Sequence, residues 1–289
     1  MKVNHKNLKS LKVTESGRSS DLISPTIVQG CAGNCRYCYA ARYFPGKFYG
    51  NVMISDNIDE VIEKMRTTDV SDIQKPNQTH EKYITWDVAC NADLLPALNH
   101  FEWEKLFDYF KYSERDMGTL ASKFVNPMLL KYNPERKVRV RMSIMPPHLS
   151  NLFEPKTAKV EKRIHFMNDL YRAGYDVHVN FSPVILYQGW EVDYCNLFHQ
   201  MNEILIDEVK SHLGAEVIFL THNKGLHEYN LKTNFEYENL LWNNYQENKV
   251  SGNGNVNVRY NRHAKAHHIN EFKTLLGSII PGAYVRYIF

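Results

Sequence analysis

Short strand-like runs alternate with helix-like segments along most of this chain, and the alternation constrains the fold more than any other feature. Five apolar runs have the length and composition of β-strands, at 83–89, 120–124, 138–144, 175–181 and 216–221. Four segments carry apolar residues at helical spacing, at 56–66, 101–112, 157–173 and 194–213. Strands that alternate with helices form a parallel sheet. We therefore expect an α/β fold, a partial (β/α)6 barrel with a C-terminal extension.

Three cysteines follow a further strand-like run at 27–30. Cys31, Cys35 and Cys38 have the spacing C-x3-C-x2-C. Three thiolates this close together can hold a metal centre, but an iron–sulfur cube normally takes four cysteine ligands. A cube held by three cysteines leaves one iron open to another ligand. Because the chemistry of such barrels lies at the carboxyl ends of the strands, this loop is where a site is expected.

A zinc site and a disulfide framework are the alternatives for these cysteines. Structural zinc takes four ligands, usually from two pairs, and the chain has only Cys90 and Cys195 besides the triplet. Five cysteines is an odd number, and the polar first twenty residues argue against a signal peptide. An iron–sulfur cluster is therefore favoured. Its oxygen sensitivity and the reduced thiols predict a cytoplasmic protein, and the short apolar runs predict no membrane partner.

The chain length suits one large α/β domain, and we divide it into three parts. Its 289 residues carry a net charge of +3, which indicates little about partners. Residues 1–22 are expected to be a loosely held arm, and residues 23–225 the barrel. Residues 226–289 are expected to be an appended extension: a hairpin around the turn-rich stretch 251–257, a helix at 270–278 and a last strand at 284–289.

Polar residues at the predicted strand ends are candidates for the site. The Cys90 thiol could supply a hydrogen atom to a carbon radical, because an S–H bond is weaker than most C–H bonds; alternatively it simply packs in the core. Lys123 and Ser143 could bind a carboxylate, or lie solvated at the rim. Tyr37 and Tyr39, inside the cysteine loop, could relay a radical or pack against a cluster and its cofactor.

The cysteine loop resembles that of the radical S-adenosylmethionine (SAM) enzymes, and further segments narrow the resemblance to the spore photoproduct lyase family. Together they cover about residues 17 to 289. The similar segments occur in order at 31–39, 89–93, 121–124, 141–144, 151–155, 173–175, 189–190, 220–222, 258–260 and 280–287. Two features depart from the family: Ala92 lies near a position where members carry serine, and the hairpin region is shorter.

This resemblance implies a reaction and roles for the candidate residues. Cys31, Cys35 and Cys38 would hold a [4Fe-4S] cluster, and Asp93, Lys123 and Ser143 would contact SAM. The enzyme would reverse the 5-thyminyl-5,6-dihydrothymine dimer in DNA to two thymines after hydrogen abstraction from C6. Cys90 would donate hydrogen to the thymine methyl radical, and Tyr39 and Tyr37 would return the thiyl to a thiol. Since no second cluster motif is present, an external low-potential electron donor is implied.

A dimer must leave the base stack to reach a buried cluster, so base flipping is expected. On the predicted hairpin, Arg259 could contact phosphate and Tyr260 could wedge or stack, while Arg262 and Lys265 extend a basic stripe. The alternative is a solvated edge strand guarded by charges. Arg139 and Arg141, which alternate with apolar residues, are either further phosphate contacts or a solvated face.

Two other functions stay open at this point. The first is a radical SAM enzyme that rearranges a modified thymine in DNA, for example in the hypermodified DNA of a bacteriophage. The second is a zinc-stabilised DNA-binding module without catalysis. Metal content separates the second alternative from the others, because a cluster contains iron and sulfide.

Overall fold

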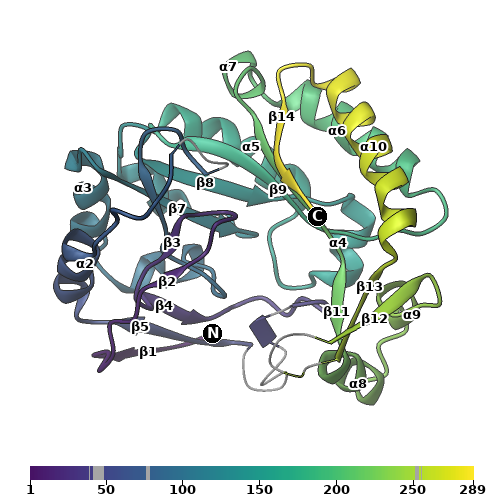
Figure 1. Ribbon diagram of the computed structural model, residues 1–289, viewed down its shortest axis with the longest axis horizontal. Helices are drawn as coiled ribbons and strands as arrows, with labels where there is room; N and C mark the ends of the chain where they lie inside the picture. Colours follow the sequence, from purple (N-terminus) through teal and green to yellow (C-terminus); the bar gives the residue numbers. More distant parts are fainter. Residues whose placement is uncertain (39, 42–48, 76–78, 251–253, 255) are drawn as a thin grey trace.

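A curved, mainly parallel sheet lies at the centre of the computed structural model, which describes residues 1–38, 40–41, 49–75, 79–250, 254 and 256–289 (Figure 1). Within these residues the sheet has eight strands in the order β14-β10-β9-β8-β7-β6-β3-β2, and every neighbouring pair is parallel except β3 and β2. The strands are β2 (Thr14–Glu15), β3 (Leu22–Ile23), β6 (Ile84–Asp87), β7 (Asp116–Ser122), β8 (Val138–Ser143), β9 (Asp176–Val184), β10 (Gly214–Phe219) and β14 (Tyr284–Ile288). The predicted α/β class with a parallel sheet is confirmed.

Amphipathic helices cover the outer face of this sheet (Figure 1). The longer ones are α2 (Ile58–Thr67), α3 (Glu104–Tyr112), α5 (Val160–Arg172), α6 (Trp190–Ile204) and α10 (Arg262–Ile279). Shorter helices also connect the strands, namely α4 (Pro147–Phe153), α7 (Asp207–Lys210) and the 3-10 helices η2 (Leu95–His100) and η3 (Pro127–Lys131). Helix α2 shows the rule, because its buried residues Ile58, Val61, Ile62 and Met65 share one face. Gly174 follows the end of α5 with a φ of +86°, as its C-cap signal predicts.

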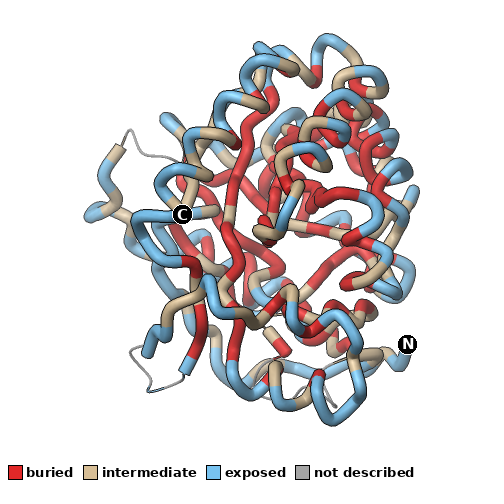
Figure 2. The backbone as a smooth tube through the Cα atoms, turned by 90° about the vertical axis from the view of Figure 1, so that its right-hand side faces the viewer, coloured by how far each residue is buried: buried red, intermediate tan, exposed pale blue. Residues whose placement is uncertain are grey.

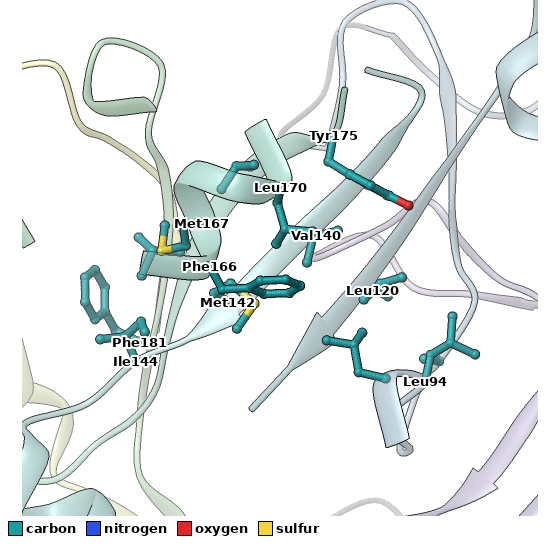
Figure 3. Close-up of a cluster of buried hydrophobic side chains, with 14 of the residues drawn as sticks. Leu94, Leu120, Val140, Met142, Ile144, Phe166, Met167, Leu170, Tyr175 and Phe181 are labelled. Carbon is teal, nitrogen blue, oxygen red and sulfur yellow. The ribbon is translucent and has the colours of Figure 1, made fainter. Parts of the chain in front are cut away.

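The main hydrophobic core lies between the sheet and these helices. Figure 3 shows Leu120 of β7 and Val140 and Met142 of β8 packed with Phe166 and Leu170 of α5. Each of these side chains is almost fully buried, and burial of each contributes roughly 1.5–3 kcal/mol. Figure 2 shows the result along the chain, where central strands are continuously buried and outer helices alternate between buried and exposed residues.

The polar residues of β8 are buried as well, which corrects one expectation. Arg139 is neither solvated nor free to contact phosphate, because its Nε lies 2.7 Å from Asp176. Arg141 lies 2.8 Å from Asp87 and 3.1 Å from Glu216, and all of β8 is buried. Buried charges are tolerated when they are paired in this way. Alternation in this strand therefore separates an apolar face from an ion-paired face.

The first 22 residues are not a loosely held arm. Strand β1 (Lys2–Lys6) pairs in parallel with β5 (Asn51–Ser55), and β5 pairs antiparallel with β4 (Val28–Gly30). Asp21 is buried and accepts hydrogen bonds from the Thr85 backbone at 2.8 Å and from Lys75 at 2.7 Å. The strand that enters the cysteine loop, β4, therefore belongs to this small sheet, and the main sheet begins earlier in the chain.

The C-terminal extension contains the predicted hairpin. Strands β12 (Gln246–Val250) and β13 (Val256–Tyr260) pair antiparallel, and β13 also pairs with β11 (Thr221–Asn223). Helices α8 (Lys224–Lys232) and α9 (Glu238–Leu241) lie beside this sheet (Figure 1). The following helix, α10, begins at Arg262 rather than near 270. Strand β14 then returns to the main sheet, where it pairs in parallel with β10 and forms the edge of the sheet.

Among the described helices, none combines the length and the apolar character that crossing a membrane requires.

Candidate active site

The cysteine loop begins where β4 ends, at a position that only glycine can occupy. Gly30 has a φ of +87°, and a Cβ there would lie 2.0 Å from the Asn51 carbonyl oxygen. Gly30 also forms a backbone bridge with Ala92, and Cys31 forms one with Tyr49. The loop is thus tied to the segment that follows β6 and to the start of β5.

The three thiols of the loop face one cavity of about 600 Å³, which Cys31, Cys35 and Cys38 help to line. None of them is in a disulfide in the described chain. Burial raises the pKa of each thiol, that of Cys31 to about 12, so a metal centre must displace the thiol proton on binding.

The donor set fits a cluster better than a single zinc ion. Among the described residues, the groups of three or more ligand atoms lying within 4.8 Å of one another do not include these thiols. Three thiolates on one zinc ion would lie about 3.8 Å apart, given Zn–S bonds of about 2.3 Å in a tetrahedron. Three sulfurs that do not all lie within 4.8 Å of one another suit a larger centre better than one zinc ion.

Neighbouring groups fix the loop around these sulfurs. The Gly33 amide donates a hydrogen bond to the Cys31 Sγ at 3.3 Å, a contact of the kind that tunes cluster potentials. The Tyr49 hydroxyl donates to the Cys35 carbonyl at 2.7 Å. The Arg36 amide donates to the Phe153 carbonyl at 2.9 Å, which attaches the loop to the end of α4.

A buried charged cluster lies directly beneath the loop. The Tyr37 hydroxyl donates to the carboxylate of Glu154, which also pairs with Arg163 at 2.7 Å. The Lys123 Nζ lies 3.8 Å from Glu154 and 5.7 Å from the centre of the Tyr37 ring. Burial acts to raise the pKa of Glu154, but Arg163 and Lys123 outweigh it and hold that pKa below its ordinary value. Burial, and then Glu154, raises the pKa of Tyr37.

Asp93 faces the same cavity and is tightly positioned. Its carboxylate accepts hydrogen bonds from the Ser122 hydroxyl at 2.8 Å, from the Lys123 amide at 3.0 Å and from the Leu95 amide at 3.1 Å. Burial raises the pKa of Asp93 to about 6 in spite of these bonds. A deeply buried carboxylate without a paired lysine or arginine side chain among the described residues favours a cationic partner.

Ser143 and Lys123 also line this cavity, Ser143 as the last residue of β8 and Lys123 as the residue that follows β7. The Asn180 amide donates to the Ser143 hydroxyl at 3.4 Å, and all three residues line the cavity. The Asn180 Oδ1 is buried and has no hydrogen-bond partner among the described groups. Lys123 donates to the Ser182 carbonyl at 3.3 Å. An unpaired buried oxygen beside a lysine and a carboxylate is suited to a ligand that carries both an ammonium and a carboxylate.

Cys90 lies next to this cavity but is not among its lining residues, whereas Asn91, Ala92 and Asp93 are. Asn91 has a left-handed φ of 59°, and its amide donates to the Cys90 Sγ at 3.4 Å. Burial, and then the nearby Asp87, raises the pKa of the Cys90 thiol to about 11. The group is therefore a neutral thiol at physiological pH.

Of the remaining candidates from the sequence, one lies outside the described residues and the others have surroundings that differ from the prediction. Tyr39 lies outside the described residues. Tyr260 is not an exposed wedge: it is buried, and its hydroxyl accepts a hydrogen bond from the Leu186 amide at 2.8 Å. Arg259 is paired with Glu247 at 2.9 Å, and Arg262 and Lys265 lie on α10 rather than on the hairpin.

The structure also adds residues that were not singled out from the sequence. Glu154, Arg163 and Asn180 are buried beside the site, and Lys249 of the hairpin lines the cavity. The sequence did carry a signal for Glu154, because this residue lies in segment 151–155, one of the segments that resemble the family. The others come into the site only through the packing of the sheet. At the same opening Arg18 lies 4.1 Å above the ring of Phe289.

Comparison with known proteins supports one family. Residues 6–289 match the family model described as spore photoproduct lyase. The spore photoproduct lyase of Bacillus subtilis is 26% identical over 213 residues, which are 73% of this chain and 59% of that protein. The one from Clostridium acetobutylicum is 27% identical over 184 residues, 63% of this chain and 52% of that protein. These matches span between about half and three-fifths of the relatives' length.

Solved structures show the same fold. A spore photoproduct lyase complexed with dinucleoside spore photoproduct has a TM-score of 0.84 at 21% identity, and the match covers 99% of this chain and 82% of that one. A double mutant with bound AdoMet and the dinucleoside has a TM-score of 0.85 at 20% identity, with the same coverage. The curved sheet and the added hairpin and helix are therefore one shared architecture.

Proposed function

Because the chain belongs to the spore photoproduct lyase family, we propose that it is a radical SAM lyase that reverses the spore photoproduct in DNA to two thymines. One observation carries the proposal. The three loop thiols share a single cavity with the buried Asp93 and Ser143 and the half-buried Lys123, which lie at or just beyond the ends of three neighbouring parallel strands. Solved members of the family have been obtained with AdoMet and with the dinucleoside lesion.

The residues of the cavity suit both cofactors. Cys31, Cys35 and Cys38 would hold a [4Fe-4S] cluster with one open iron. Asp93 would attract the ammonium group of SAM, while Lys123 and Ser143 would bind its carboxylate. When bound, the cluster and SAM would supply the 5'-deoxyadenosyl radical for hydrogen abstraction from C6 of the lesion. The protein's part is to orient these groups and to exclude water.

Cys90 is the proposed hydrogen donor to the thymine methyl radical. Two properties support this role. The thiol keeps its proton at neutral pH because burial and Asp87 raise its pKa to about 11, and a hydrogen donor needs that proton. The segment that carries it is tied to the cysteine loop by the Gly30–Ala92 bridge. The hydrogen bond from Asn91 would hold the sulfur at the edge of the cavity.

Tyr37 and Tyr39 are proposed to return the resulting thiyl to a thiol. For Tyr37 the support is its hydrogen bond to Glu154, because oxidation of a phenol releases a proton together with the electron. Glu154 would hold that proton close by, and the electron and a proton would restore the Cys90 thiol. The tyrosyl radical left behind would then recover a hydrogen atom from the methyl group of 5'-deoxyadenosine as SAM is regenerated. Turnover would begin with an electron from an external low-potential donor.

Lys249 and Arg18 are the proposed DNA contacts nearest to the site, since both are cations that line the cavity. The flipped lesion would enter between them, with phosphates held electrostatically. Arg259, Arg262 and Lys265 stay as proposed phosphate contacts further along the hairpin and α10. Tyr260 is not proposed as a contact, because it is buried.

An anaerobic repair assay tests the function. The protein would be reconstituted with iron and sulfide, reduced with dithionite, and mixed with SAM and an oligonucleotide containing the 5-thyminyl-5,6-dihydrothymine dimer. Restored thymines would support the lyase. Formation of 5'-deoxyadenosine without repair would contradict it and favour a modified thymine in DNA as the substrate. Zinc in place of iron, with neither product, would favour a non-catalytic DNA-binding module.

A further inference from the structure

A second group of potential metal ligands lies outside the cavity, where β11, α8 and α9 meet. Ligand atoms of His222, His227 and Glu238 all lie within 4.8 Å of one another. The Glu238 Oε1 is 2.8 Å from the His222 Nε2 and 2.7 Å from the His227 Nδ1. Residues from three elements thus direct two imidazole nitrogens at one carboxylate oxygen.

The charge balance of this group differs from that of two other buried glutamates. Glu154 is paired with Arg163, and Glu216 with Arg141 and Arg286. The Glu238 side chain is only 4% exposed, yet within the described chain no lysine or arginine lies within ion-pairing distance of it. Its contacts are the two imidazoles and Asn230. Buried carboxylates are normally paired with a cation or coordinate a metal ion.

We propose that His222, His227 and Glu238 form a binding site for a divalent metal ion of the zinc class. Two imidazoles and a carboxylate are a donor set that suits zinc, and such sites leave a fourth position to water. Water can reach this position beside His227, whose side chain is 21% exposed. On binding, each imidazole coordinates through the nitrogen that now faces Glu238, and any proton on that nitrogen moves to the other ring nitrogen or to solvent.

Surrounding groups hold the ligands in place. The Asn230 amide donates to the Glu238 Oε2 at 2.7 Å, which leaves Oε1 for the ion. The His227 ring stacks on Trp242 with centroids 4.3 Å apart, and His222 meets the same indole edge-on. Outer contacts of this kind fix the orientation of metal ligands.

The site is connected to the cysteine loop through Asn230. The Asn230 amide also donates to the Arg36 carbonyl at 2.7 Å, between Cys35 and Cys38. The Arg36 guanidinium donates to Thr233 at 3.3 Å. An ion that holds Glu238 in place therefore also holds Asn230, which is hydrogen-bonded to the backbone of the cysteine loop at Arg36. The bound ion would stabilise the cysteine loop through Glu238 and Asn230.

Zinc binding to the cluster-loaded protein tests this site without any repair assay. Zn²⁺ alone would be titrated anaerobically against a chromophoric chelator, and bound metal counted after gel filtration. We expect one zinc per chain beside the cluster iron. His227→Ala should weaken the affinity by more than about 100-fold, and Asn230→Ala by about 10-fold as an outer contact. The matched control is His263→Ala, an exposed histidine on α10.

Two results of the binding experiment would overturn the proposal. One is no bound zinc at micromolar free metal, and the other is equal zinc binding by wild type, His227→Ala and Glu238→Gln. The Glu238→Gln variant keeps the size of the side chain and covers the case in which His227→Ala does not fold. A chelator should also lower the melting temperature of wild type but not that of Glu238→Gln. Unchanged melting of both proteins would contradict a stabilising ion at this site.

Discussion

Gly30, the residue before the first cysteine, is bridged through its backbone to Ala92, two residues after Cys90. The contact joins β4 of the small sheet to the segment that follows β6 of the main sheet. It holds the proposed cluster ligands and the proposed hydrogen donor in one fixed arrangement. Because a Cβ on Gly30 would meet the Asn51 carbonyl of β5 at 2.0 Å, this position requires glycine.

Replacing Cys90 with alanine should separate radical formation from clean repair. The cluster ligands are untouched, so 5'-deoxyadenosine should still form. Restored thymine should fall at least about 10-fold, with side products in its place, because no thiol quenches the substrate radical. Chromatography of both products checks this. Cys195→Ala, on α6, is the matched control and should behave as wild type. Clean repair by Cys90→Ala would exclude Cys90 as donor.

Alkylation of Cys90 should be slow at neutral pH and rise steeply in alkali. Only the thiolate reacts, and burial with Asp87 raises the thiol pKa to about 11. The logarithm of the rate should therefore climb with pH through 10 without a plateau, in cluster-loaded protein that carries Cys195→Ser. Asp87→Asn should move the curve to lower pH, since it removes a negative neighbour. A plateau of the rate near pH 8.5 in the protein that keeps Asp87 would contradict the raised pKa of the Cys90 thiol.

Glu154→Gln should destabilise the protein by about 3–5 kcal/mol, because the buried Arg163 would lose its anionic partner. Glu63→Gln removes an exposed partner of Arg66 and should cost less than about 1 kcal/mol. Denaturant midpoints of the two variants and wild type provide the comparison. Similar small losses of stability in both variants would mean that the buried ion pair of Glu154 and Arg163 contributes little to the free energy of unfolding.

Lys249→Ala should weaken DNA binding, and Tyr260→Phe should not. Lys249 lines the cavity, so its loss should reduce the slope of log affinity against log salt by about 1. Tyr260→Phe should instead lower stability by about 1 kcal/mol, through loss of the bond to the Leu186 amide. DNA titrations of both variants at several salt concentrations check the predicted difference in DNA affinity. Loss of DNA affinity in Tyr260→Phe alone would reverse the assignment.

The parallel sheet and the cysteine loop could be predicted from the sequence because both depend on local signals. Alternating periodicity predicts strands and helices, and Gly174 ends its helix by its own backbone preference. The partners of a strand are not local. Nothing in residues 27–30 reveals that β4 pairs with β5 rather than entering the main sheet.

Polar side chains were harder to place for the same reason. The alternation around Arg141 predicts two faces, but its partners Asp87 and Glu216 are 54 and 75 residues away in the chain. Tyr260 follows a basic residue and a turn, as an exposed ring would, and only the packing against Phe219 and Leu186 buries it. Asn180 and His222 enter their clusters through tertiary contacts alone.

Repair in deuterium oxide tests the central claim most directly. The Cys90 thiol exchanges its hydrogen with solvent, so a thymine methyl quenched by it acquires deuterium. The reconstituted protein, given SAM and the dimer-containing oligonucleotide, should restore both thymines, one of them with a single deuterium in its methyl group by mass spectrometry. Formation of 5'-deoxyadenosine without any restored thymine would contradict the lyase assignment. Two restored thymines without deuterium would contradict the role of Cys90.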